Sequence, residues 1–163
     1  MKRRSFLKSG GTAAAATILP SSVFGQNAPS KQVTFGFVGT GGMGGANIGR
    51  VLKLAGDGAR ILGVCDVDRF HCEGAAANVN KAQGNKDCAM TGDFRELTRR
   101  DDIDAIVVST PDNWHALPAI DAIRHGKDVY VEKPLTLTVR EGQVLVSEMR
   151  KHKRVGQTGT QQR

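Results

Sequence analysis

Two groups of residues near the start of the chain have the types and spacing needed to hold a dinucleotide. The turn Gly39-Thr40-Gly41-Gly42-Met43-Gly44 follows an apolar run that begins at Val33, and Asp66 ends a second such run. A glycine pattern placed between a strand and a helix, with an acid about 20 residues later, is typical of a dinucleotide-binding turn. The alternative is a flexible glycine-rich loop that binds nothing.

Each part of this turn has a mechanical role. Gly39 would permit the tight turn after the strand, Gly41 would let the backbone approach a pyrophosphate, and Gly44 would let the helix pack closely. The phosphates would then lie against unpaired N–H groups at the helix start, in the turn completed by Thr40, Gly42 and Met43.

Asp66 is placed to accept hydrogen bonds from the hydroxyls of the adenosine ribose, and its charge would repel a 2′-phosphate. The acid therefore favours NAD over NADP. Arg69 is close enough in sequence to hold such a phosphate, so NADP remains the second choice. An ordinary acid in a turn after a strand is the alternative for Asp66.

Lys133 is the candidate for proton transfer. It follows an apolar run and precedes Pro134, which fixes the local backbone. A lysine that is partly desolvated or close to other cations can exchange a proton with a substrate hydroxyl or carbonyl near neutral pH. Considered alone, a lysine after a strand is more often a solvated loop cation.

The elements that would position these residues alternate along the chain. Strands are expected at 32–38, 59–65, 88–90, 104–109, 127–131 and 154–158, and helices at 42–55, 69–83, 93–99, 114–125 and 138–152. Strands separated by helices predict right-handed crossovers and a parallel sheet. We therefore predict an α/β fold with a doubly wound parallel sheet of the Rossmann type, in the order 3-2-1-4-5-6, and a ligand at the carboxyl ends of its strands.

The net charge of +7 over 163 residues does not indicate nucleic-acid binding. Lys2, Arg3, Arg4 and Lys8 supply much of the excess, and a second basic cluster at 150–154 lies at a helix end, where cations complement the helix dipole. Cys65, Cys72 and Cys88 form no C-x-x-C pair, so we expect buried thiols and no metal site.

Residues 1–25 are similar to a twin-arginine export signal, with basic residues, a mild apolar segment and small residues before Gln26. Twin-arginine export carries proteins that are already folded, so we expect a location outside the cytoplasm and contact with the membrane only during export. The alternative to an export signal is a basic, disordered tail. Residues 26–31 are interpreted as a linker, 32–158 as the dinucleotide-binding domain, and 159–163 as the start of a second domain.

The motifs together resemble the Gfo/Idh/MocA oxidoreductase family. They are the glycine turn, Cys65-Asp66-Val67-Asp68, Ser109-Thr110-Pro111-Asp112-Asn113-Trp114-His115, and the run from Gly126 to Glu132-Lys133-Pro134. The resemblance implies a nicotinamide cofactor, a sugar or polyol substrate, and Lys133 as a catalytic residue that also touches the nicotinamide ribose. It further implies cofactor contacts from Thr110, Pro111, Asn113, His115 and Glu132. For His115 the alternative is a residue at a helix start whose ring is bonded to the backbone.

The resemblance also implies a second domain that carries most of the substrate pocket, a further catalytic histidine and a homo-oligomer interface. From this chain we therefore expect cofactor binding but little turnover. Three functions stay open: a hydride-transferring oxidoreductase acting on carbohydrates, a glycosidase that uses bound NAD without net redox change, and a non-catalytic dinucleotide-binding module.

Overall fold

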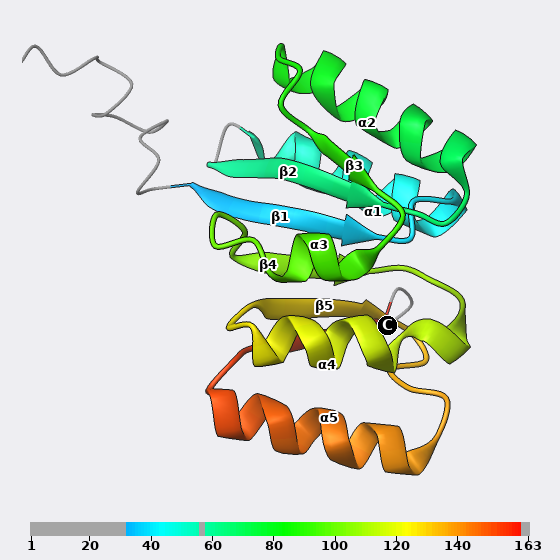
Figure 1. The fold of residues 1–163 in the computed structure, drawn as a ribbon, viewed down its shortest axis with the longest axis vertical. Coiled ribbons are helices and arrows are strands. Elements are labelled where there is room, and N and C mark those ends of the chain that lie inside the picture. The colour runs from blue at the N-terminus through cyan, green and yellow to red at the C-terminus, as the bar shows by residue number, and fades with distance from the viewer. Residues whose placement is uncertain (1–31, 56–57, 161–163) are drawn as a thin grey trace, which may run out of the picture.

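The computed structural model describes residues 32–55 and 58–160, and it contains one six-stranded parallel sheet with helices on both faces (Figure 1). The strands are β1 (Val33–Val38), β2 (Ala59–Cys65), β3 (Ala89–Thr91), β4 (Ala105–Val108), β5 (Asp128–Glu132) and β6 (Gly156–Gly159). The helices are α1 (Gly42–Lys53), α2 (Arg69–Gln83), α3 (Phe94–Thr98), α4 (Ala116–Arg124) and α5 (Val139–His152). The strand order is β3-β2-β1-β4-β5-β6, which confirms the predicted doubly wound arrangement.

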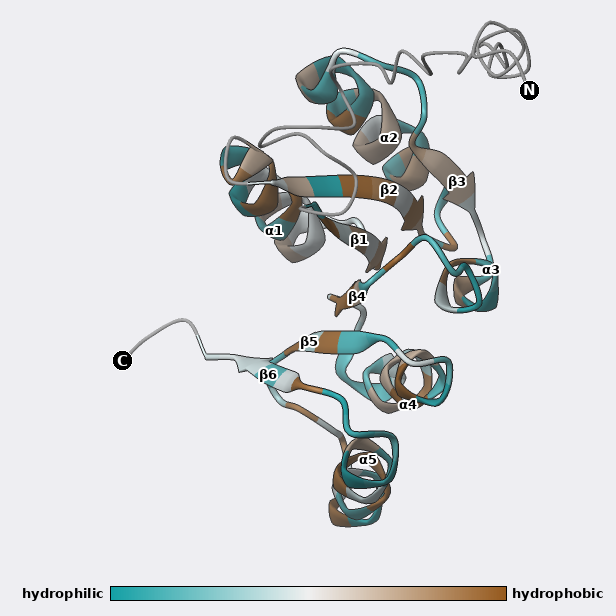
Figure 2. Cartoon of the chain, turned by 90° about the vertical axis from the view of Figure 1, so that its left-hand side faces the viewer, coloured by the Kyte–Doolittle hydropathy of each residue, from teal (hydrophilic) through white to brown (hydrophobic). Residues whose placement is uncertain are grey.

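The alternation of side chains along each strand divides the core into two apolar layers. Phe37 and Val64 face the layer that α1 and α2 cover, while Val38 and Cys65 face the layer covered by α3, α4 and α5. Figure 2, viewed from a second side, shows α1 on one side of the sheet and α3, α4 and α5 on the other. Strands buried on both faces need near-continuous apolar sequence, as Ile106-Val107-Val108 has in β4.

Several predicted helix boundaries are confirmed by capping contacts. Asp93 accepts a hydrogen bond from Arg95 N at the start of α3, and Thr138 forms a reciprocal capping box with Glu141 at the start of α5. Gly126 follows α4 with a φ of 77°, a left-handed conformation that suits glycine. One expected helix differs. In place of a single helix at 114–125, the chain forms a 3-10 turn, η5 (Asp112–Trp114), and then α4, because the turn already starts after Pro111.

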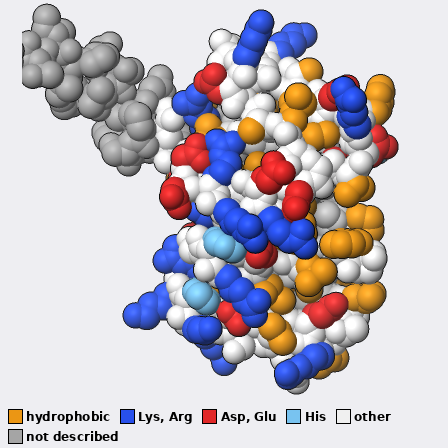
Figure 3. Space-filling model, in the orientation of Figure 1, with side chains coloured by type: hydrophobic (Ala, Val, Ile, Leu, Met, Phe, Trp, Pro, Cys, Tyr) orange, Lys and Arg blue, Asp and Glu red, His pale blue; other side chains and the backbone are white. Residues whose placement is uncertain are grey.

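The carboxyl ends of all six strands meet at one edge of the sheet, the side toward which the arrows point in Figure 1. Exposed apolar side chains gather on that side in Figure 3. They come from segments that directly follow the strands, and they include Val67, Phe70, Trp114, Leu117 and Leu137. An apolar, exposed edge of this kind marks a surface used for binding.

The export signal and linker predicted for residues 1–31 lie outside the described residues, as does most of the expected start of a second domain. Those assignments stay predictions. Within the described residues, none of the helices combines the length and the apolar character needed to cross a bilayer.

Candidate functional site

The glycine turn between β1 and α1 is built so tightly that two of its glycines tolerate no side chain. Gly39 has a φ of 85°, and a Cβ there would stand 2.7 Å from the backbone of Ser109 and Thr110. A Cβ on Gly44 would overlap the carbonyl oxygen of Gly39. Gly41 is different, because the nearest atoms to a Cβ there belong to His71, 3.8 Å away. The turn is closed toward the sheet and open toward solvent at Gly41.

The start of α1 lacks the side-chain cap that the other long helices have. Its N-cap residue is Gly41, which offers no side-chain hydrogen bond, whereas Asp68 caps α2 and Thr138 caps α5. A helix N-terminus carries unpaired N–H groups and a partial positive charge, so an anion is favoured there. The open position at Gly41 and the uncapped helix start therefore coincide.

Asp66 lies across from this turn and is bonded to it. Its Oδ2 accepts hydrogen bonds from Thr40 N at 2.7 Å and Thr40 Oγ1 at 3.0 Å, and its Oδ1 accepts one from Asp68 N at 2.9 Å. Partial burial alone would raise the pKa of Asp66, but these hydrogen bonds and the nearby His71 outweigh it and lower the pKa below its ordinary value. The carboxylate is thus ionised at neutral pH and holds the turn in place.

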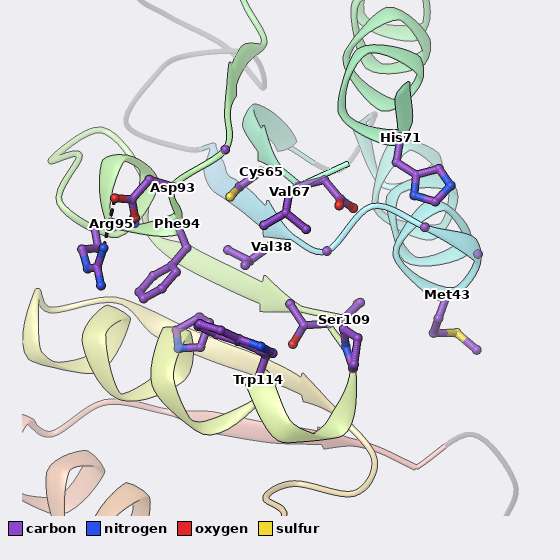
Figure 4. Close-up of a pocket in the computed structure, with 18 residues that line it drawn as sticks. Val38, Met43, Cys65, Val67, His71, Asp93, Phe94, Arg95, Ser109 and Trp114 are labelled. Carbon is purple, nitrogen blue, oxygen red and sulfur yellow. Dashed lines mark hydrogen bonds and ion pairs between the residues drawn. The ribbon is translucent and has the colours of Figure 1, made fainter. Parts of the chain in front are cut away.

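A cavity of about 750 Å³ extends from the glycine turn along the carboxyl edge of the sheet (Figure 4). His71 and Met43 lie at one end of it, and Phe94 and Arg95 lie at the other. Most of its lining is apolar. The residues that line it are Val38, Gly39, Gly41, Gly42, Met43, Cys65, Asp66, Val67, His71, Gly92, Asp93, Phe94, Arg95, Ser109, Thr110, Pro111, Trp114 and Pro118.

Two features of this cavity suit a polar ligand. Thr110 Oγ1 is buried and has no hydrogen-bond partner within the described part of the chain, although Thr110 lines the cavity. A buried hydroxyl without a partner costs free energy, which a bound acceptor or donor would recover. The open approach at Gly41 is the second feature. Both fit a phosphate-bearing dinucleotide of the size that the cavity admits.

Two predicted cofactor residues, at the ends of β4 and β5, are instead bonded within the protein. His115 is 1% exposed, and its Nδ1 and Nε2 lie 2.6 Å and 2.8 Å from the carbonyl oxygens of Pro134 and Thr110. This geometry matches the alternative assignment for His115, in which its ring is satisfied by backbone. Glu132 is 4% exposed and accepts a hydrogen bond from Asn47 Nδ2 at 2.9 Å.

Lys133 and Asn113 are exposed and do not line the cavity. Lys133 follows β5 directly and is joined to Pro134 by a cis peptide bond. His115 bonds the carbonyl of that proline, so the loop carrying Lys133 is tied to the loop after β4. The structure thus places Lys133 at the predicted edge of the sheet, with its side chain in solvent.

Several residues of the site were not singled out from the sequence. Asn47 bonds both Ser109 and Glu132, and so links α1 to the ends of β4 and β5. His71 and Phe94 lie at opposite ends of the cavity. The first turn of a helix that follows a strand faces the carboxyl edge, and this rule would have pointed to His71 and Phe94.

The three cysteines are buried free thiols, as expected. Burial and the neighbouring Cys72 raise the pKa of Cys65 to about 12 and that of Cys88 to about 11. Thiols with such values are poor nucleophiles at neutral pH. In the described ranges, no three His, Cys, Asp or Glu side chains are grouped so that they could hold a metal ion.

Comparison with known families decides the assignment. The model of the Gfo/Idh/MocA family, described as "Oxidoreductase family, NAD-binding Rossmann fold", matches residues 33–160. The chain belongs to this family. The matched range includes the glycine turn, Asp66 and the Glu132-Lys133-Pro134 run described above.

Relatives of the chain carry two kinds of name. An "Alpha-N-acetylgalactosaminidase" of Shewanella oneidensis is 35% identical over 161 residues, covering 85% of this chain and 35% of that protein. A "Glycosyl hydrolase family 109 protein" of Shewanella putrefaciens is 34% identical over the same shares. The chain therefore spans about a third of the length of these relatives.

The similar solved structures are named as a dehydrogenase and an oxidoreductase. The myo-inositol dehydrogenase of Lactobacillus casei, solved with NAD(H) and myo-inositol, is similar with a TM-score of 0.69 and 27% identity, over 78% of this chain and 36% of that one. An NAD-binding oxidoreductase of Klebsiella pneumoniae has a TM-score of 0.67 and 26% identity, over 78% and 34%.

Proposed function

We propose that this domain binds NAD and supplies the cofactor-binding part of an oxidoreductase that takes a hydride from the hydroxyl-bearing carbon of a sugar or polyol, or returns one to the corresponding carbonyl carbon. The observation that carries the proposal is the cavity beside an uncapped helix start, open at Gly41 and lined by the partnerless hydroxyl of Thr110. The pyrophosphate would lie against Gly41 and Gly42, where backbone N–H groups and the helix dipole favour an anion.

The adenosine end would lie between Asp66 and the apolar end of the cavity. Asp66 lines the cavity and would accept hydrogen bonds from the ribose, and Phe94 and Trp114, which also line it, would offer flat surfaces for a base. Arg69 does not face this region as a free cation, because it donates to Glu73 Oε1 at 2.6 Å and its side chain is 90% exposed. The arrangement supports NAD over NADP, since a 2′-phosphate would meet the Asp66 carboxylate. Arg95, at the other end of the cavity, is paired with Asp93 at 3.1 Å.

Lys133 would carry the proton that accompanies hydride transfer. When bound, the nicotinamide supplies the hydride acceptor or donor. The amine of Lys133 would accept the proton of a substrate hydroxyl during oxidation, or return it during reduction. The bond between His115 and the Pro134 carbonyl would fix the direction in which Lys133 leaves the sheet.

The names of the Shewanella relatives favour a second candidate, a glycosidase that uses NAD without net redox change. Oxidation of a sugar hydroxyl to a carbonyl would acidify the neighbouring C–H, so that the aglycone could leave by elimination with a proton. Water would then add in its place, and return of the hydride to the carbonyl carbon would restore the cofactor. The same cavity and the same lysine serve this chemistry, so the two candidates differ in the substrate and the final redox balance.

Binding and activity are tested separately. Calorimetry with NAD and NADP on the purified chain is expected to show one saturable site with higher affinity for NAD. A folded chain that shows no binding at millimolar NAD would overturn the proposal.

Activity is assayed on the longest product of the coding sequence. Net NADH formation from free sugars or polyols supports the oxidoreductase, and cleavage of an aryl N-acetylgalactosaminide without net NADH supports the glycosidase. Binding of NAD with neither activity would support the third candidate, a non-catalytic dinucleotide-binding module.

A further inference from the structure

His71 is a titratable side chain that lines the cavity beside the glycine turn. It lies in the first turn of α2, with half of its side chain exposed. Its Cε1 and Nδ1 are each 3.8 Å from the position that a Cβ on Gly41 would take. Figure 4 places its ring at the glycine-turn end of the cavity, beside Met43. The ring thus stands at a point where the turn is open to a ligand.

We infer that His71 is a phosphate ligand of the bound nucleotide and makes nucleotide affinity depend on pH near neutrality. This inference rests on the proposed function and adds a residue and a condition to it. A histidine ordinarily changes charge between about pH 5 and 8, the range in which the pyrophosphate of NAD keeps its charge constant. A protonated ring beside the turn attracts those phosphates, and a neutral ring does not.

The surroundings of His71 leave room for such a contact. The charged groups that face it are two acids, Asp66 at the end of β2 and Asp68 at the start of α2. Asp68 Oδ2 is 3.8 Å from Nδ1, while Asp68 Oδ1 caps the helix by accepting from Phe70 N and His71 N. From α1 and its turn, the cavity lining near His71 is Gly41, Gly42 and Met43, which bring no side-chain charge.

These two acids also explain why the charge on His71 matters. Without a cation nearby, the phosphates of a nucleotide would enter a cavity whose nearest ionised side chains are carboxylates. Protonation of His71 offsets that charge at the site of contact. Because the ring is half exposed, solvent screens the attraction, and the gain in affinity is expected to be about fivefold.

The test measures nucleotide affinity by calorimetry from pH 5.5 to 8.0 in phosphate-free buffers. Wild-type affinity for NAD is expected to fall about fivefold as the pH rises across this range. His71→Gln, which cannot gain charge, is expected to bind with the weaker affinity at every pH. His71→Lys, which keeps its charge, is expected to stay near the tighter value throughout. Titrations in two buffers of different ionisation enthalpy report proton uptake, which should occur in wild type and vanish in both variants.

Controls separate this effect from other titrating groups. His125→Gln changes an exposed histidine at the far end of α4, paired with Asp121, and should keep the wild-type pH dependence. Thermal unfolding of each variant checks that the fold is intact. NADP distinguishes the two phosphate sources: a dependence that His71→Gln removes with NADP alone assigns His71 to the 2′-phosphate, and one that it removes with both nucleotides assigns it to the pyrophosphate. A dependence that persists with NADP in His71→Gln belongs to the 2′-phosphate itself, which has a second pKa of about 6.

The outcomes that overturn the inference differ from those that overturn the proposed function. Saturable binding of NAD and NADP with a pH dependence that His71→Gln leaves unchanged, or with no pH dependence at all, removes the role of His71 and retains the nucleotide site. Absence of binding at every pH removes both.

Discussion

The two halves of the carboxyl edge are organised in opposite ways. Beside β1 and β2, the backbone turn is open at Gly41, α1 has no side-chain cap, and a cavity follows. Beside β4 and β5, the polar side chains His115 and Glu132 are buried and bonded within the protein. The first half is arranged to receive a ligand with its backbone, and the second is arranged to hold a loop from which Lys133 extends.

This difference shows which half of the carboxyl edge can bind a ligand without other parts of the protein. An uncapped helix start beside a cavity can bind an anion without further parts. An exposed lysine at a strand end has no cavity of its own in the described residues, so its chemistry depends on what is brought to it. Nucleotide affinity should therefore respond to changes in the glycine turn, and folding stability should respond to changes around His115.

The largest effect on affinity is expected from Gly41→Asp. Its side chain would fill the open space at Gly41, and its charge would repel the pyrophosphate. We expect NAD affinity to fall at least about 100-fold, equivalent to about 2.7 kcal/mol. Thermal unfolding should change little, because no atom lies closer than 3.8 Å to the new Cβ.

Gly74→Asp is the matched control, because it adds the same charge on an exposed position of α2 with nothing within 4 Å. Calorimetry should give wild-type NAD affinity for this control. Unchanged affinity in Gly41→Asp itself would remove the turn as the phosphate site.

A pair of glycine substitutions in α1 separates close packing from helix propensity. Gly44→Ala places a methyl group onto the Gly39 carbonyl, and we expect it to lower the free energy of unfolding by about 3 kcal/mol. Gly49→Ala has nothing within 4 Å and should raise it by about 0.5–1 kcal/mol, because alanine favours the helix. Urea unfolding measures both, and equal effects of the two changes would contradict the packing at Gly44.

His115→Gln tests the other half of the edge. Both ring nitrogens face carbonyl oxygens, and the single amide nitrogen of glutamine cannot replace both of them, so one buried carbonyl loses its contact. We expect the free energy of unfolding to fall by about 2 kcal/mol. NAD affinity of the folded variant should fall far less than in Gly41→Asp. A large loss of affinity with unchanged stability would instead show that His115 contacts the cofactor.

The sequence predicted the fold and the glycine turn well, because both follow from local rules. Strand and helix alternation sets the parallel sheet, and the positions of Gly39 and Gly44 reflect contacts within a few residues or with one neighbouring strand. The orientations of His115 and Glu132 depend on Pro134 and Asn47, which are distant in sequence. Such pairings appear only when the fold brings the loops together, so sequence motifs marked these residues without showing which way they point.

Asp66→Ala tests nucleotide choice within the open half. Loss of a charged acceptor for the ribose should weaken NAD about tenfold, while NADP should weaken less, because the repulsion of its 2′-phosphate is also removed. The ratio of the two dissociation constants, measured by calorimetry, is therefore expected to move toward NADP. Asp101→Ala, an exposed acid in the turn before β4, should leave the ratio unchanged. A ratio that does not move in Asp66→Ala would show that this acid has no part in choosing the cofactor.

The smallest expected effect is the pH dependence of folding that Asp66 contributes. Because its pKa is lowered in the folded chain, its contribution to stability is present above the ordinary carboxyl value of about 4 and is lost as the pH falls through the folded value. The group is only partly buried, so solvent screening limits this contribution to less than about 1 kcal/mol. Asp66→Asn should therefore lose stability less steeply than wild type between about pH 5 and 3. Urea unfolding at several pH values measures the two slopes, and parallel slopes would mean that the hydrogen bonds from Thr40 and Asp68 do not favour the ionised carboxylate.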